Sequence, residues 1–198
     1  MLQQNRSLCL ASSSPRRREL LTRFGLDFLM QSPDTDESVR NHESPEAFVT
    51  RMALEKAQRV APDHPEYITL AGDTVVVLDQ KILGKPQDRT DSIRMLEQLS
   101  GKTHEVFTAY TLMDGISGPW VQELVRTRVS FRSLTSELIR TYVQTGETDD
   151  KAGAYSIQGL GTMLVATIDG SYSNVVGFPI ERILDNMMRR GWLSCKPS

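Results

Sequence analysis

The chain has 198 residues, 39% of them hydrophobic and 24% charged, and its formal net charge is −2. This length suits one domain or two closely joined lobes, and the near-neutral charge excludes a global attraction to nucleic acid or to an anionic membrane. No apolar run approaches the roughly 20 residues of a membrane span, and the polar residues 1–6 lack the order of a secretory signal. Cys9 and Cys195 form neither a disulfide framework nor a metal pair, which predicts a reducing cytoplasm.

Residues 7–11 (SLCLA) predict a strand, and a helix is expected to begin soon after it, at Pro15. Ser14 suits the N-cap, and proline suits the first helical position. Arg16, Arg17 and Arg18 then fall in the first turn, where cations oppose the helix dipole and repel one another. Free amides, serine hydroxyls and guanidinium groups at one helix start make a phosphate site, with a solvated basic turn as the equal alternative. The apolar face of this helix would carry Leu20, Leu21 and Phe24.

A short strand over 26–30 and an acidic loop over 32–41 are expected next. Carboxylates in such a loop are usually solvated, but opposite the arginine turn they could hold a divalent metal. Residues 45–60 predict a helix with apolar residues at helical spacing. Lys56 borders its buried face, from which most lysines reach water and some end in an active-site cleft.

Residues 67–78 give the strongest strand pattern, with β-branched residues that predict burial on both faces. Asp73 lies in its middle, where an ionised carboxylate is costly unless it is paired or bound to metal. Gly72 precedes it and marks a bulge or a close approach by a ligand. These features favour a functional Asp73 over a solvated strand end. A hairpin tip over 79–81 then leads to residues 84–86 (GKP).

The second half of the chain predicts a mixture of strands and helices. The expected elements are a helix over 91–99, an alternating strand over 105–113, a turn over 114–119, a strand with one wet face over 121–131, a helix from 135 or 136 to 146, an irregular segment over 149–159, a strand over 163–168, a last helix after 175–179, and a loose tail after Trp192.

Several familiar motifs are absent. Residues 101–103 (GKT) lack the earlier glycine and the following helix of a phosphate-binding loop. No serine lies in a GxSxG elbow. His42, His64 and His104 are scattered, and we interpret them as surface or incidental residues. Cations and carboxylates without a histidine or cysteine nucleophile point to phosphate-ester or anhydride chemistry, in which a metal and a carboxylate orient water.

The chain resembles the Maf-like nucleoside triphosphate pyrophosphatases nearly from end to end. The matching motifs are residues 11–20 (ASSSPRRREL), 55–57 (EKA), 71–75 (AGDTV), 84–86 (GKP), 99–101 (LSG), 150–155 (DKAGAY), 157–159 (IQG) and 175–179 (VVGFP). Their combination and order are specific, although each alone is weak. Phe178 stands where leucine is more usual.

This resemblance implies a single α/β domain over residues 1–198, with a Maf/ITPase-like mixed central sheet flanked by helices and an active-site cleft between two lobes. It implies hydrolysis of a nucleoside triphosphate to the monophosphate and pyrophosphate with a divalent metal, Mg²⁺ or Mn²⁺. By position, Asp73 would be the proton acceptor and, with Glu37, would hold the metal. The implied triphosphate ligands are Ser12, Arg17, Lys56 and Lys85, and the implied base-specificity residues are Arg16, Thr74 and Gln158.

The motifs at 150–155 and 157–159 resemble the dTTP/UTP branch of the family, whereas the 7-methyl-GTP branch has glutamate in place of the glutamine. A glutamine amide can accept from the pyrimidine N3–H and donate to a carbonyl, so Gln158 favours uracil or thymine. The main hypothesis is therefore a dTTP/UTP pyrophosphatase that removes non-standard, including modified pyrimidine, nucleotides. Its rivals are a 7-methyl-GTP enzyme and a nucleotide-sensing regulator of cell division, because the family also implies an effect on septum formation. The resemblance suggests a homodimer; a nucleic-acid or membrane partner is not expected.

Overall fold

The computed structural model describes residues 2–115 and 119–195, with the side chains of residues 119 and 120 left out. The elements in chain order are β1 (Leu2–Gln4), β2 (Leu8–Ala11), α1 (Pro15–Arg23), β3 (Phe28–Gln31), α2 (Pro45–Val60), the 3₁₀ helix η1 (Ala61–Asp63), β4 (Ile68–Leu78), β5 (Lys81–Leu83), α3 (Arg89–Leu99), β6 (Thr103–Asp114), β7 (Pro119–Phe131), α4 (Ser136–Gln144), the 3₁₀ helices η2 (Ala152–Ala154) and η3 (Gly159–Leu164), β8 (Val165–Asp169), α5 (Tyr172–Val176), α6 (Ile180–Arg189) and β9 (Leu193–Cys195).

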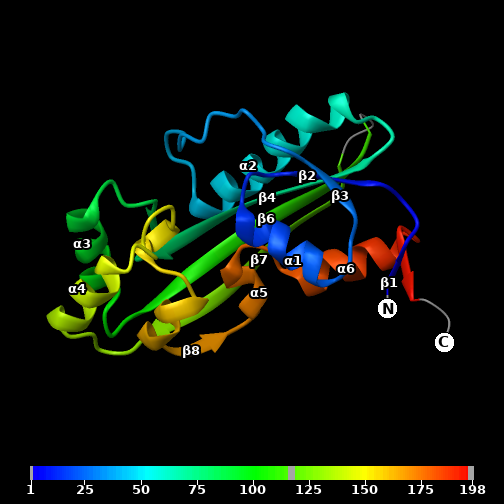
Figure 1. Cartoon of the computed structure of the whole chain (residues 1–198). Helices are drawn as coiled ribbons and strands as arrows, with labels where there is room; N and C mark the ends of the chain where they lie inside the picture. Colours follow the sequence, from blue (N-terminus) through cyan, green and yellow to red (C-terminus); the bar gives the residue numbers. More distant parts are fainter. Residues whose placement is uncertain (1, 116–118, 196–198) are drawn as a thin grey trace.

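The fold is an α/β arrangement around one mixed sheet, as the sequence predicts. Its strands run in the order β3-β2-β4-β6-β7-β8, with β5 also paired to β4. β2 is parallel to both β3 and β4, whereas β4, β6, β7 and β8 pair antiparallel. Figure 1 shows α2 over one face of the sheet, α1, α5 and α6 over the other, and α3 and α4 towards one end. None of the helices in the described ranges is long and apolar enough to cross a membrane.

β4 is buried on both faces because each face has its own helical layer. Val75 and Val77 pack with the α2 side chains Phe48 and Met52. The alternate residues, such as Val76, belong to the larger cluster that includes α1, α3, α4 and α6. This two-sided burial explains why the strand reads as a nearly continuous apolar run.

The same pattern extends to β6, which confirms the strand predicted over 105–113 and is buried on both faces despite its alternating sequence. Every residue from Val106 to Met113 is buried, because α2 covers one face of this strand and α5 and α6 lie on the other. β7 does have the predicted wet face, with Arg126 and Arg128 exposed on either side of the buried Thr127.

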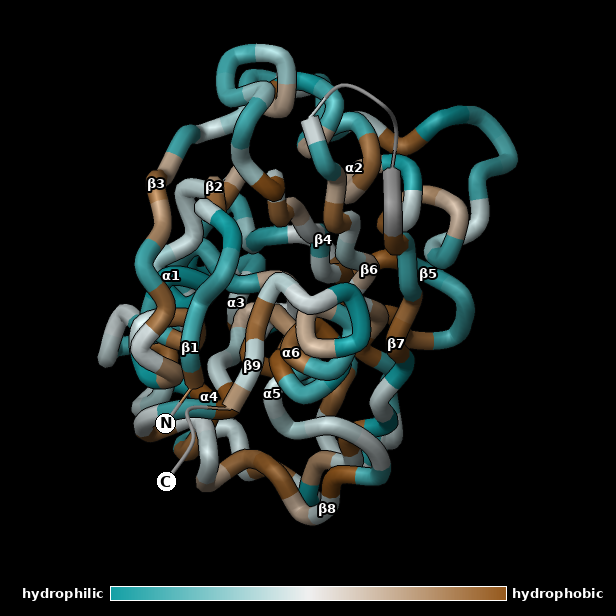
Figure 2. The backbone as a smooth tube through the Cα atoms, turned by 90° about the vertical axis from the view of Figure 1, so that its right-hand side faces the viewer, coloured by the Kyte–Doolittle hydropathy of each residue, from teal (hydrophilic) through white to brown (hydrophobic). Residues whose placement is uncertain are grey.

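The chain ends are tied together in a way that the sequence does not predict. β1 pairs antiparallel with β9, so Leu193–Cys195 forms a strand where a loose tail is predicted, and the two strands lie side by side in Figure 2. The rest of the predicted tail, residues 196–198, lies outside the described residues. The turn over 114–119 lies partly outside the described residues, and the strand predicted from residue 163 begins at Val165, after η3. Phe24 is 40% exposed and does not join the buried face of α1.

His104 and Cys9 are both buried, and His104 thereby differs from the surface position predicted for it. His104 is 1% exposed and not a surface residue, and its Nε2 lies 2.8 Å from the Tyr155 hydroxyl. Cys9 and Cys195 are both free, and burial raises the pKa of the Cys9 thiol to about 11, so this thiol is unreactive.

Candidate active site

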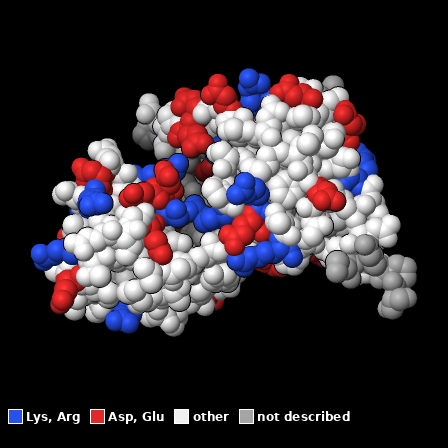
Figure 3. Space-filling model, viewed as in Figure 1, with Lys and Arg blue, Asp and Glu red and all other residues white. Residues whose placement is uncertain are grey.

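A cavity of about 750 Å³ lies at a break in the sheet edge. β2 pairs with β4 from Ile68 to Ala71, and β5 pairs with it from Val76 to Leu78. Between these pairings, the β4 edge at residues 72–75 has no neighbouring strand on that side among the described elements. Figure 3 shows a hollow on this side of the molecule with lysine and arginine side chains gathered in it.

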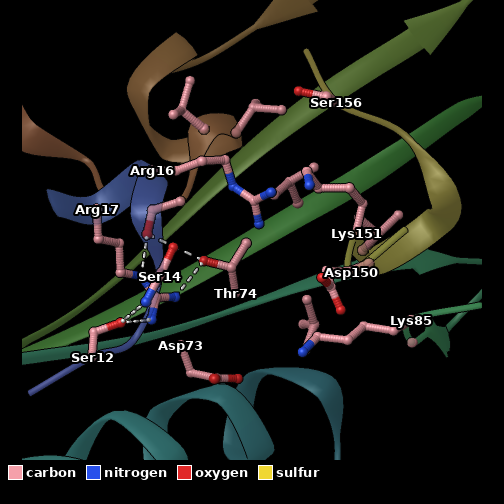
Figure 4. Close-up of a pocket in the computed structure, with 18 of the residues that line it drawn as sticks. Ser12, Ser14, Arg16, Arg17, Asp73, Thr74, Lys85, Asp150, Lys151 and Ser156 are labelled. Carbon is pink, nitrogen blue, oxygen red and sulfur yellow. Dashed lines mark hydrogen bonds between the residues drawn. The ribbon is translucent and has the colours of Figure 1, made fainter. Parts of the chain in front are cut away.

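The cavity brings together every residue that the sequence predicts for the site. Its lining includes Ser12, Arg16, Arg17, Glu37, Lys56, Asp73, Thr74, Lys85 and Gln158. Figure 4 shows Ser12, Arg16 and Arg17 entering from the α1 side, and Lys85 and Asp150 facing them across the cavity.

Asp73 and Thr74 face opposite layers because they are consecutive residues of one strand. On the α2 side, the Lys56 Nζ lies 2.7 Å from Asp73 Oδ1 and 2.7 Å from Glu37 Oε1. The Lys56 and Asp73 side chains are 7% and 13% exposed, whereas that of Glu37 is 58% exposed. Lys56 is therefore buried and paired, and it links a strand carboxylate to a loop carboxylate.

The environment of Glu37 favours its charged form. Partial burial opposes ionisation, but the hydrogen bond and charge of Lys56, with the charges of Lys85 and Arg17, lower the pKa of Glu37 below its ordinary value. Glu37 is thus a carboxylate at neutral pH, available to a cation.

The Arg17 guanidinium group donates hydrogen bonds to four groups of the protein. Its Nε donates to the Gly177 carbonyl at 3.0 Å and its Nη1 to the Gly72 carbonyl at 2.6 Å. Nη1 also lies 3.3 Å from Ser12 Oγ, and Nη2 donates to Thr74 Oγ1 at 3.1 Å. Burial lowers the pKa of Arg17, against the opposing charge of Asp73. These contacts use four of its five N–H groups, so Arg17 organises the wall of the cavity and has one donor left.

The start of α1 keeps donors available to a ligand. Ser12 Oγ accepts from the Ser14 amide at 3.1 Å as well as from Arg17, so its own proton is not used in these two bonds. The Ser14 side chain makes no capping bond, although Ser14 is the N-cap as predicted. In contrast, Ser44 and Thr135 cap their helices through side-chain oxygens. The first turn of α1 therefore presents uncapped amides and hydroxyls beside Arg16.

The opposite wall carries charged residues that the sequence reasoning did not assign to the site. Asp150 and Lys151 line the cavity with Ser156. Burial lowers the pKa of Arg16, which the charge of Asp150 partly offsets. Burial and the nearby Arg16 also lower the pKa of Lys151. Asp150 has a positive φ of 61°, and the signal that could have found these residues is the 150–155 motif itself.

Gln158 presents an unengaged amide to the cavity. Its backbone N–H donates to Ser156 Oγ at 3.2 Å, but its side chain makes no hydrogen bond within the described part of the chain. Thr74 differs, because its hydroxyl also lies 2.9 Å from Thr108 Oγ1 and 3.3 Å from the Gly177 carbonyl.

The carboxylates fit a divalent cation that is shared with a bound phosphate. No group of three or more His, Cys, Asp or Glu side chains in the described ranges could hold a metal alone. Mg²⁺, however, is usually held by one or two carboxylates together with substrate phosphates and water. Asp73 and Glu37 each contact Lys56 through one oxygen, which leaves the second oxygen of each available to a cation.

The fold defines the broad class of the protein. A HAM1 protein from Coxiella burnetii has a similar structure, with a TM-score of 0.53 at 16% identity, covering 93% of this chain and 99% of that one. The chain is thus an α/β protein with the HAM1-like fold.

Sequence comparison defines the family within that class. Residues 7–190 match the family described as Maf-like protein, and the chain belongs to this family. The dTTP/UTP pyrophosphatase of Desulfotalea psychrophila is 46% identical over 95% of this chain and 96% of its own length. The dTTP/UTP pyrophosphatase of Shewanella denitrificans is 52% identical over 86% and 89%.

Proposed function

We propose that this protein is a nucleoside triphosphate diphosphatase that hydrolyses dTTP and UTP to the monophosphate and pyrophosphate. The observation that carries the proposal is the Asp73–Lys56 ion pair at the wall of a cavity that also gathers the cations Arg16, Arg17 and Lys85. The two relatives named above, both dTTP/UTP pyrophosphatases, support it because they match this chain over most of its length. Modified pyrimidine nucleotides would use the same contacts.

In the proposed reaction, Asp73 accepts a proton from water as the water oxygen attacks the α-phosphorus. The bond from that phosphorus to the α–β bridging oxygen breaks, and pyrophosphate leaves. Arg16, Lys85 and the start of α1 offset its growing negative charge. Lys56 keeps Asp73 in place and offsets its charge.

A divalent cation, Mg²⁺ or Mn²⁺, held by Asp73 and Glu37 would neutralise charge on the triphosphate. The two carboxylates approach a common point at Lys56 Nζ, although they come from β4 and from the loop before α2. This arrangement supports the predicted metal ligands.

We assign base selection to Gln158, whose free amide can match the uracil or thymine edge. Arg16 and Thr74 would complete the selection, Thr74 through its contact with Arg17. Residues 1–198 would act as one two-lobed domain, since residues from both walls line one cavity. A cytoplasmic setting, a homodimer and an effect on septum formation stay predictions.

The proposal is tested by measuring pyrophosphate release from a panel of nucleoside triphosphates with Mg²⁺. We expect dTTP and UTP to be the preferred substrates, and Gln158→Glu to shift preference towards 7-methyl-GTP. A protein that binds UTP without releasing pyrophosphate would support the nucleotide sensor instead. An unchanged preference in Gln158→Glu would remove Gln158 as the selecting residue.

A further inference from the structure

We propose that Glu147, which lies outside the cavity, is a positioning residue that selects the base by fixing the segment that carries Gln158. The inference rests on the proposed function, in which Gln158 reads the pyrimidine. It concerns the turn after α4 and the chain from Ser156 to Gly161.

Glu147 holds this segment just after Gln158 through two backbone amides. Its Oε1 accepts from the Leu160 N–H at 3.0 Å, and its Oε2 accepts from the Gly161 N–H at 3.1 Å. These are amides at the start of η3, where a carboxylate is most favourable. Both carboxylate oxygens are therefore committed to the backbone, and Glu147 does not line the cavity.

Tyr142 of α4 holds the same segment just before Gln158. Its hydroxyl accepts from the Ser156 N–H at 3.0 Å. Burial raises the pKa of Tyr142 to about 12, and the nearby Glu147 charge contributes, although the Ser156 amide opposes the shift. The two side chains thus fix the backbone on both sides of Gln158.

The segment that carries Gln158 requires glycine at two positions beside Glu147 and Tyr142. Gly159 has a φ of +64°, and a Cβ there would lie 2.6 Å from Glu147 Oε1. A Cβ at Gly161 would lie 2.0 Å from the Ser156 carbonyl oxygen and 2.7 Å from the Tyr142 hydroxyl. The glycine of the 157–159 motif is therefore explained by its left-handed backbone conformation, and the Glu147 carboxylate packs directly beside it.

Gln158 depends on this support because its own side chain has no partner in the described structure. The orientation of the Gln158 side chain is therefore set by its backbone. The hydrogen bonds from backbone amides to the Glu147 carboxylate, which fix that backbone, are of a strong, charge-assisted kind. Loss of Glu147 should therefore loosen base selection and leave the triphosphate site, formed by other elements, intact.

The test compares Glu147→Gln and Glu147→Ala with Glu137→Gln, a control at an exposed glutamate of α4. We expect both Glu147 variants to reduce the kcat/KM preference for UTP over CTP by about tenfold, since each loses charge-assisted hydrogen bonds that hold the segment. Inhibition by inorganic tripolyphosphate, which has no base, should stay unchanged. The control should match the unmodified protein in both measurements.

A double-mutant cycle separates positioning from general damage. In a Gln158→Ala background, Glu147→Gln should cause no further loss of UTP preference. Additive losses, weaker tripolyphosphate inhibition or an unchanged UTP preference would overturn the inference. If Glu147→Ala does not fold, Glu147→Gln, which keeps the side-chain shape, decides the question. Absence of UTP and dTTP hydrolysis in the unmodified protein would instead refute the proposed function.

Discussion

Arg17 shows how a residue identified as a phosphate ligand from sequence can have a second role in the fold. Its guanidinium group contacts Ser12, Thr74 and two backbone carbonyls, and it lies 5.0 Å from the centre of the Phe178 ring. A basic run such as residues 16–18 does not say which member turns inward. The structure places Arg17 inside, 8% exposed, and leaves Arg18 exposed.

Arg17→Ala should therefore lower the stability of the protein as well as its affinity for UTP. Removing the guanidinium leaves two buried carbonyls and two hydroxyls without this partner, so we expect a loss of about 3 kcal/mol. Urea denaturation measures this change. Arg18→Ala is the control and should stay within about 0.5 kcal/mol of the unmodified protein. Equal stability of the two variants would show that Arg17 serves only the ligand.

His104 gives the stability of the fold a dependence on pH. Burial lowers the pKa of His104 from 6.5 to about 4. Between these values the unfolded chain binds a proton that the folded chain does not, so the stability must fall as the pH falls from 6.5 towards 4. The full effect is about 3 kcal/mol.

The contribution of His104 is measured as a difference between proteins, because carboxylates titrate in the same range. Urea denaturation at pH 7 and pH 4.5 should show a smaller loss of stability for His104→Gln than for the unmodified protein. His64→Gln, at a partly exposed histidine, is the control. The same loss in all three proteins would contradict the assignment.

At the scale of the elements, the site depends on the bare edge of β4 between β2 and β5. Gly72 lies at the start of this edge, and its carbonyl accepts from Arg17. A Cβ at this position would lie 2.4 Å from Phe178 Cε1 and 2.9 Å from the Ala109 carbonyl oxygen. The glycine is needed because Phe178, in the turn before α6, and the β6 backbone at Ala109 both approach the position that its Cβ would occupy.

Gly72→Ala should accordingly disturb both fold and site. Overpacking of this kind costs about 1–3 kcal/mol, and displacement of Phe178 would also move Arg17. We expect a lower melting temperature and weaker UTP binding by calorimetry. Gly84→Ala provides the comparison, since a Cβ at Gly84 has nothing within 4 Å. Equal effects at both glycines would count against the close approach.

At the scale of the whole molecule, the sequence predicts the features that depend on local periodicity and on recognisable motifs. The α2 bounds and the two-sided burial of β4 follow from periodicity, and the set of site residues follows from the family resemblance that the motifs carry. The pairing of β1 with β9 does not, because Leu2–Gln4 and Leu193–Cys195 are short segments without a pattern that meet only in the folded chain. The 150–155 motif marks its segment as important, but an irregular segment does not indicate which of its side chains, here Asp150 and Lys151, face a cavity.

The assignment of the chemistry to Asp73 is tested most directly by Asp73→Asn, assayed with UTP and Mg²⁺. Because the amide cannot accept the water proton, pyrophosphate release should fall by about 10²–10⁴-fold, while calorimetry should show that UTP still binds. Asp79→Asn, at an exposed position in the turn that follows β4, should keep full turnover. Turnover that persists in Asp73→Asn, or a loss of binding that accounts for the loss of rate, would contradict the assignment.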